Sequence, residues 1–209
     1  MQFEEYLAIE HGGAQMNAPV VISESLIASG VRRVAGEVAD WCGGGVPLQV
    51  VSVLNGAKPF TQDLQKELAA LGVPHDVHAV KLSNTLGTRS TGDVALEQGA
   101  LPPEKMRRGR VLIVDDIIDT CATAHFIKRM VEDMVPAEVR IAAVVNKYAR
   151  HSHMAHFLVH DLKFAERPIR SPEGQPVDYW LFGYGMDLNG KYRELPKIAW
   201  VEVPAPANS

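Results

Sequence analysis

The sequence RVLIVDDIIDTCAT, residues 110–123, carries most of the information about the fold of this chain. An apolar run typical of a buried strand ends in two adjacent carboxylates, Asp115 and Asp116, and a third, Asp119, follows shortly after. The turn from Asp119 to Thr123 then opens a segment with helical periodicity. In open α/β sheets ligands bind beyond the carboxyl ends of the strands. This stretch therefore predicts a binding site at the end of a central strand.

The turn at 119–123 has the composition of a phosphate site. Backbone N–H groups and hydroxyls at a helix N-terminus bind phosphate through hydrogen bonds and through the helix dipole. Asp115 and Asp116 suit the two hydroxyls of a ribose or the water shell of Mg²⁺. The alternative is that the three acids are solvated loop residues that cap the helix. Their placement between a buried strand and a helix start favours the binding site.

Further apolar runs on both sides of this stretch complete the fold prediction. They are rich in valine and isoleucine and lie at 48–54, 77–82, 111–114 and 141–145. Amphipathic helical patterns occupy 23–42, with Ser23 as the capping residue, 60–68 and 122–134. Strands that are apolar on both faces and alternate with helices predict an α/β fold with a central, mainly parallel sheet flanked by helices.

The two ends of the chain predict a smaller lobe. The runs YWLF at 179–182 and IAWVEV at 198–203 have the composition of strands, and they can pair with N-terminal structure to form a hood over the main sheet. We expect a single domain with a core at about 43–165 and a hood from about 1–42 and 166–209. The polar segment 86–93 and the segment SPEGQP at 171–176 are expected to be loops.

Composition argues against several classes of protein. The formal net charge of −4 argues against a basic nucleic-acid-binding surface. The two cysteines, Cys42 and Cys121, form no disulfide framework and fit a reducing compartment. No apolar run reaches the roughly 20 residues that a membrane helix needs, and the start of the chain lacks the pattern of a signal peptide. We therefore expect a cytoplasmic protein that binds neither nucleic acid nor membrane.

At this point the sequence resembles a known family. VLIVDDIIDTCAT is similar to the signature with which type I phosphoribosyltransferases bind 5-phosphoribosyl-1-pyrophosphate (PRPP). Four further blocks resemble hypoxanthine-guanine phosphoribosyltransferases in the family's order: VLNGAKPFTQDL at 53–64, STGD at 90–93, VVNKYAR at 144–150 and DYWLFGYGMDLNGKYRELP at 178–196. The resemblance implies the type I phosphoribosyltransferase fold and a purine salvage reaction. In that reaction hypoxanthine or guanine joins PRPP in the presence of Mg²⁺, and pyrophosphate is released. It also implies a homodimer or homotetramer.

The resemblance assigns roles around PRPP. Asp119 is the implied catalytic acid/base, which faces the imidazole-ring nitrogen of the purine. Asp115 and Asp116 would address the ribose hydroxyls and a metal-bound water, and Arg193 would hold the pyrophosphate oxygens. The other implied PRPP contacts come from donors on two loops, at Asn55, Gly56, Thr120, Cys121, Ala122 and Thr123.

At the base end of the site, the part that would bind the purine, the implied residues are Lys147, Trp180, Leu181 and Asp187. Lys147 would donate to the exocyclic oxygen, and an ammonium offers only donors, so it favours a 6-oxopurine over adenine. Trp180 would stack on the purine and Leu181 would supply backbone contacts. Asp187 would bind a second Mg²⁺ that bridges to pyrophosphate. Without the surrounding blocks, Lys147 would be read as a surface charge. For Trp180 the alternative is a core or hood aromatic.

Three departures from the family pattern stand out. Asn55 replaces the lysine of many members, Cys121 replaces the usual glycine, and Asn84-Thr85 occupies the place of a Ser-Tyr pair in the flexible loop. A cysteine at 121 is strained if the position needs a positive φ, and it fits if the residue simply begins the helix.

Other functions stay open at this level. A different base such as xanthine, a non-catalytic PRPP- or nucleotide-sensing regulator of the same fold, and a plain phosphate-binding domain are the alternatives. The joint presence of Lys147, Trp180, Asp187 and Arg193 favours the enzyme. The histidine-rich segment HSHMAHFLVH at 151–160 also leaves a zinc or nickel site conceivable, although its spacing matches no known motif.

Overall fold

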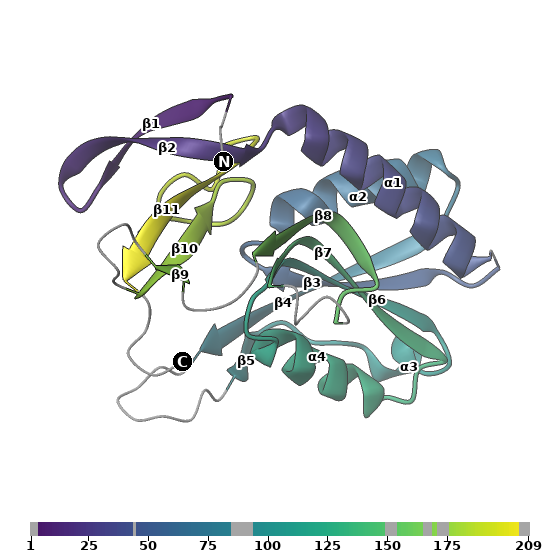
Figure 1. Ribbon diagram of the computed structural model, residues 1–209. Helices are drawn as coiled ribbons and strands as arrows, with labels where there is room; N and C mark the ends of the chain where they lie inside the picture. Colours follow the sequence, from purple (N-terminus) through teal and green to yellow (C-terminus); the bar gives the residue numbers. More distant parts are fainter. Residues whose placement is uncertain are drawn as a thin grey trace.

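The computed structural model describes residues 4–43, 45–84, 94–148, 154–164, 169–170 and 176–204, which form two sheets and four helices (Figure 1). The larger sheet has the strand order β5 (Val94–Gln98), β4 (His75–Asn84), β3 (Leu48–Leu54), β6 (Arg110–Ile118), β7 (Glu138–Tyr148) and β8 (Phe157–Phe164). Its neighbouring strands are parallel except for β4 and β5, which are antiparallel. The predicted α/β fold with a mainly parallel central sheet is confirmed.

Helices cover both faces of this sheet (Figure 1). α1 (Glu24–Cys42) and α2 (Lys58–Ala70) pack on one face, and α4 (Ala122–Glu132) packs on the other, with the short α3 (Pro103–Met106) before β6. The alternation in β6 explains the two cores, because Leu112 and Val114 lie with α1 and α2 whereas Val111 and Ile113 lie with α4. A central strand that is buried on both faces is thus apolar at every position.

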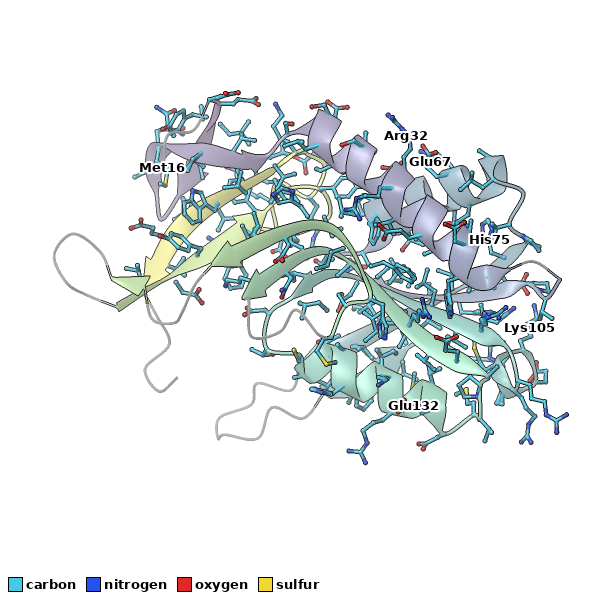
Figure 2. The ribbon with its side chains drawn as sticks, turned by 45° about the vertical axis from the view of Figure 1, so that its right-hand side comes forward. Met16, Arg32, Glu67, His75, Lys105 and Glu132 are labelled. Carbon is cyan, nitrogen blue, oxygen red and sulfur yellow. The ribbon has the colours of Figure 1, made fainter. Side chains whose placement is uncertain are left out.

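α1 begins and ends as its sequence predicts. The Ser23 hydroxyl accepts a hydrogen bond from the Leu26 backbone N–H, and Gly43 ends the helix in the left-handed conformation at φ 60°. α1 lies against α2 and β8, and Figure 2 shows Arg32 of α1 beside Glu67 of α2, where they form an ion pair of 3.8 Å. We had expected residues 1–42 to belong to the hood. Because α1 buries its apolar stripe on the larger sheet, we propose that the larger lobe begins at α1 instead.

The hood is a five-stranded antiparallel sheet. Its order is β1 (Tyr6–His11), β2 (Ala14–Ile22), β11 (Ile198–Pro204), β10 (Pro176–Phe182) and β9 (Ile169–Arg170). β11 pairs with β2, so the N-terminal and C-terminal segments do form one small lobe (Figure 1). Within the described residues, no helix is long and apolar enough to cross a membrane.

One boundary differs from the sequence prediction in a way that matters for the site. We expected the strand to end before Asp115, but β6 continues to Ile118 and remains paired with β7. Asp115 and Asp116 therefore belong to the strand, and the loop begins only at Asp119. The extra hydrogen bonds to β7 keep the chain extended through the two carboxylates. The expected loop at 86–93 and the STGD block lie outside the described residues, as do Thr85 and residues 171–175.

Candidate active site

The residues of the predicted phosphate site lie on the turn between β6 and α4. Thr120 and Ala122 are exposed, Thr123 is half-buried, and the Thr120 hydroxyl accepts from the Ala122 N–H at 3.5 Å. The first amides of an α-helix have no intrahelical partner, so this turn offers donors to an anion. Cys121 begins α4 at φ 66° and is almost fully buried. Of the two alternatives raised by the sequence, the structure thus shows the strained one, since an L-residue with a side chain rarely adopts this φ.

The two strand carboxylates differ in exposure. Asp115 is only 5% exposed, and its Oδ1 accepts the Asp116 N–H at 3.0 Å. Burial raises the pKa of Asp115 well above its ordinary value, and the neighbouring Asp116 carboxylate adds to the rise. Burial also raises the pKa of Asp116. Asp116 is half-buried and faces a pocket, so it is the better placed of the two to meet a ligand.

The loop at Asn55 and Gly56 lies directly against Asp116. A Cβ atom on Gly56 would fall 1.8 Å from Asp116 Oδ2, so no larger residue fits at this position without movement. The peptide bond from Leu54 to Asn55 is cis, and the Asn55 carbonyl accepts from the Lys58 N–H at the start of α2. The loop after β3 and the end of β6 thus meet at the same edge of the sheet, as parallel topology requires.

A turn of the hood closes over this loop. Gly185 has φ 97°, and a Cβ there would lie 1.9 Å from the Gly56 carbonyl oxygen. The preceding residue, Tyr184, is buried and donates its hydroxyl to Asp63 of α2 at 2.9 Å. The segment 183–195 is therefore fixed to the larger lobe at the level of the site, which holds its functional side chains in place.

Between the two lobes lies a pocket of about 150 Å³. It contains all four residues predicted for the purine base, together with Asp116 of β6 and Asp119 just after that strand. The lining residues are Asp116, Ile117, Asp119, Lys147, Tyr179, Trp180, Leu181, Met186, Asp187 and Arg193. Segments far apart in the sequence, from β6, β7, β10 and the 183–195 turn, thus converge on one cavity.

Two residues of the pocket lining, Lys147 and Asp119, belong to a cluster of charged side chains. Lys147, near the end of β7, has a side chain only 5% exposed, and its Nζ lies 3.5 Å from Asp119 Oδ2. The same Nζ lies 3.1 Å from Oδ1 of Asp178, a residue of β10 that is itself nearly buried. The ammonium is therefore held at the pocket by carboxylates from both lobes, which rules out the interpretation of Lys147 as an ordinary surface charge.

Trp180 and the turn that follows β10 also line the pocket. The Trp180 ring is about half exposed, and its indole N–H donates to the Asp187 carbonyl oxygen at 2.6 Å. This hydrogen bond fixes the position of the ring. Its exposure argues against a core aromatic, although Trp180 does belong to strand β10 of the hood. Arg193 donates to Asp187 Oδ1 and to the Gly185 carbonyl, each at 2.6 Å, and the Gly190 N–H donates to Asp187 Oδ2 at 2.7 Å.

The donor set fits Mg²⁺ better than a softer metal. Asp116 and Asp187 present hard carboxylate oxygens to the pocket, and Mg²⁺ is usually bound by one or two carboxylates plus substrate phosphates and water. The described part of the chain holds no cluster of three or more histidine, cysteine, aspartate or glutamate residues that would form a complete protein cage for a metal. A Mg²⁺ held by these two carboxylates would complete its coordination with substrate phosphates and water.

Sequence reasoning missed some residues of the site. Asp178 was quoted within a motif but given no role, although it lies two residues before Trp180 and side chains in a strand alternate between faces. Ile117, Tyr179 and Met186 also line the pocket; they too lie within the quoted motifs, but no role was assigned to them. Asn55 lies outside the pocket, on a neighbouring cavity of about 330 Å³ beside α2.

The histidine-rich segment forms part of the larger sheet. His160 lies in β8, and His156 lies just before that strand, where its Nδ1 accepts the Ile141 N–H at 3.1 Å. His151 and His153 lie outside the described residues. Within the described ones, these histidines take part in no metal-binding cluster.

Comparisons with known proteins agree with this geometry. The model of the phosphoribosyl transferase domain family matches residues 23–162. The hypoxanthine-guanine phosphoribosyltransferase of Crithidia fasciculata is 29% identical over 73% of this chain and 67% of its own length. That of Streptococcus pneumoniae is 28% identical over 86% and 90%. The solved hypoxanthine phosphoribosyltransferase of Trypanosoma cruzi superposes with a TM-score of 0.70 at 26% identity, covering 87% of this chain and 94% of that one. The family model spans β6, the turn that follows it and α4, and this chain belongs to the phosphoribosyl transferase family.

Proposed function

We propose that this protein is a purine salvage enzyme that transfers the phosphoribosyl group of PRPP to a 6-oxopurine, hypoxanthine or guanine, and releases pyrophosphate. The observation that carries the proposal is the convergence of Asp119, Lys147 and Trp180 on one pocket that adjoins the phosphate turn. The names of the similar proteins, which are hypoxanthine and hypoxanthine-guanine phosphoribosyltransferases, support the choice of base.

In this proposal PRPP lies at the carboxyl ends of the neighbouring strands β3 and β6. The turn from Thr120 to Thr123 holds the 5′-phosphate through backbone N–H groups and hydroxyls at the start of α4. Asp116 addresses the ribose hydroxyls, and Asp115 supports it from behind, since its burial argues against direct contact. Gly56 and Arg193 hold the pyrophosphate, for which backbone donors and a planar guanidinium are suited.

The base occupies the pocket between Lys147 and Trp180. The indole stacks on the purine ring, and the Lys147 ammonium donates to the exocyclic oxygen. Adenine presents an amino group at that position, which would set a donor against a donor. Leu181 and the turn around Asp187 supply the backbone groups at the rim. The arrangement therefore favours an oxopurine over adenine.

The chemical step follows from this placement. A ring nitrogen of the purine attacks the anomeric carbon, the bond from that carbon to pyrophosphate breaks, and the electron pair leaves with pyrophosphate. Asp119 accepts the proton from the purine nitrogen, a contribution of order 10²- to 10⁴-fold. Holding the two substrates in line supplies a further share by lowering the entropy cost of the encounter.

Mg²⁺ belongs to the proposal as a substrate-bridging ion. When bound, it neutralises the charge that develops on the leaving pyrophosphate. Asp187 and Asp116 are the residues that would hold it. Arg193, which pairs with Asp187 at 2.6 Å, lies where it can contact the same pyrophosphate oxygens. We also propose assembly as a homodimer or homotetramer and a cytoplasmic location, in line with the family resemblance.

A direct assay tests the proposed function. The protein is mixed with PRPP and Mg²⁺ and with hypoxanthine, guanine, xanthine or adenine in turn, and the nucleotide formed is measured. We expect product with hypoxanthine or guanine and none with adenine. A product with xanthine alone would reassign the base, and the absence of nucleotide with all four would leave the chain as a non-catalytic member of its family.

The role of Asp119 has its own test. Asp119→Asn removes the proton acceptor and leaves the shape of the site nearly unchanged, so turnover should fall by about 10²-fold or more while PRPP binds as before. Calorimetry measures the binding and the nucleotide assay measures the turnover. Wild-type turnover in this variant would show that another group takes the proton.

A further inference from the structure

The charge cluster around Lys147 contains one carboxylate that the proposed mechanism does not use. Asp178 Oδ1 lies 3.1 Å from Lys147 Nζ, closer than Asp119 Oδ2 at 3.5 Å. Its side chain is 12% exposed, against 35% for that of Asp119. A carboxylate is rarely so buried unless it is paired, and this one joins a strand of the hood to a strand of the larger sheet.

The strand that carries Asp178 is firmly held. The Tyr179 ring stacks on Trp200 of β11 with ring centroids 3.6 Å apart, and β10 pairs with β11 from Val177 to Phe182. Asp178 Oδ1 also accepts the Tyr179 N–H at 2.8 Å, which fixes the rotation of its carboxylate. Alternation along the strand places Asp178 and Trp180 on one face. The lysine anchor and the stacking ring are therefore set by the same short segment.

The two carboxylates around Lys147 cannot have the same task. In the proposed reaction Asp119 takes up a proton and loses its negative charge. Were Asp119 to carry the pairing alone, this step would leave a buried ammonium without a charged neighbour, which is costly. Asp178 takes no part in proton transfer, so the ammonium keeps a carboxylate at 3.1 Å before and after the step.

We propose that Asp178 is a positioning residue that holds the Lys147 ammonium at the base end of the pocket and so determines the affinity for the oxo group of the purine. This inference rests on the proposed function. It predicts an effect on the base and not on PRPP, because neither Asp178 nor Lys147 is among the proposed contacts of PRPP, which lie on β6, on the loops after β3 and β6, and at Arg193. A residue that only anchored the hood would affect both substrates alike.

Two variants of Asp178 distinguish a residue that positions Lys147 from one that only anchors the hood. Asp178→Asn keeps the shape and an acceptor oxygen but removes the charge, and Asp178→Glu keeps the charge but moves it by one methylene. Glu202→Gln is the matched control, since Glu202 is an exposed carboxylate on the neighbouring strand β11, opposite Tyr179. For each protein we would measure kcat, the KM for hypoxanthine and for PRPP, and the Kd for inosine monophosphate and for ribose 5-phosphate.

For Asp178→Asn we expect the hypoxanthine KM and the inosine monophosphate Kd to rise about tenfold, as for loss of a charged hydrogen-bond partner. The PRPP KM and the ribose 5-phosphate Kd should stay within about twofold. Asp178→Glu should raise only the two base-dependent constants, by about threefold, a partial rescue. The control should match the wild type. If Asp178→Asn does not fold, the selective effect of Asp178→Glu still decides the matter.

Equal changes for base and PRPP, or a lower kcat with unchanged KM values, would overturn the inference and leave Asp178 a structural anchor. These outcomes differ from failure of the proposed function. If the proposed function is wrong, the wild-type protein itself forms no nucleotide and binds neither inosine monophosphate nor ribose 5-phosphate, and the role of Asp178 is then refuted together with that function.

Discussion

Replacing Gly56 by alanine adds one methyl group at the most crowded point of the site. The new Cβ would lie 1.8 Å from Asp116 Oδ2 and 2.4 Å from its Cγ. Carbon and oxygen atoms in contact normally stay roughly 3.3 Å apart, so a gap of about 1.5 Å must open. Either the Asp116 carboxylate turns away or the loop at 55–56 shifts. A shift of the loop would also press its carbonyl against Gly185 of the hood turn.

The cost follows from this geometry. Overpacking a filled site by one methyl group destabilises a protein by about 1–3 kcal/mol. Catalysis should suffer more, because displacing catalytic groups by about 1 Å can lower the rate by about 10²-fold. We therefore expect Gly56→Ala to lose most of its nucleotide formation while it remains folded. The loss should fall on PRPP, through a higher KM and a lower kcat, because the loop lies at the PRPP end.

Urea unfolding and steady-state kinetics measure the two effects. The matched control is Gly36→Ala, since Gly36 lies within α1 and a Cβ there would meet no atom within 4 Å. Alanine in a helix interior should stabilise the protein by about 0.5–1 kcal/mol and leave activity unchanged. If Gly56→Ala behaved like this control, the close approach of the 55–56 loop to Asp116 would not exist in solution.

Three further predictions concern other parts of the molecule. Lys147→Met should raise the hypoxanthine KM by about 10- to 100-fold and leave the PRPP KM nearly unchanged in the kinetic assay, since a charged hydrogen bond is lost; an equal rise for both substrates would argue against its role. Cys121→Gly should be more stable than Cys121→Ala by about 1 kcal/mol in urea, because only alanine retains the left-handed strain at φ 66°; equal stabilities would contradict that strain. Burial lowers the pKa of His156, so the folded state binds fewer protons than the unfolded one, and stability should fall as the pH drops below about 6.5. His156→Asn, which keeps an acceptor for the Ile141 N–H, should lose less of its free energy of unfolding between about pH 7 and 5.5 than the wild type, as measured by urea unfolding; an unchanged pH dependence would exclude His156 as a source of the acid destabilisation.

Much of the fold could be predicted because the chain follows local rules consistently. The apolar runs in β3, β6 and β7 are those of strands buried on both faces, and Ser23 and Gly43 delimit α1 by capping chemistry. The edge strands β5 and β8 were not predicted. Their polar residues, such as Glu97 and His160, carry a weak strand signal, and pairing with a neighbouring strand decides their conformation.

The candidate site was predictable in part, because several of its residues lie within short motifs that can be recognised in the sequence. Motif resemblance pointed to Asp119, Lys147, Trp180 and Arg193, and the structure places these four at one pocket. The exposure of Asp115 and the pairing of Asp178 depend on contacts between segments far apart in the chain, which periodicity does not encode. The positive φ of Cys121 likewise follows from how β6 leads into α4, so the sequence could only pose it as an alternative.

The most direct test of the account is a crystal structure of the protein with inosine monophosphate. The account predicts the phosphate at the Thr120–Thr123 turn, and the purine between Trp180 and Lys147 with its oxo group within hydrogen-bonding distance of the lysine Nζ. A nucleotide bound with its phosphate elsewhere, for example in the cavity beside Asn55 and α2, or with its base away from Lys147, would contradict it.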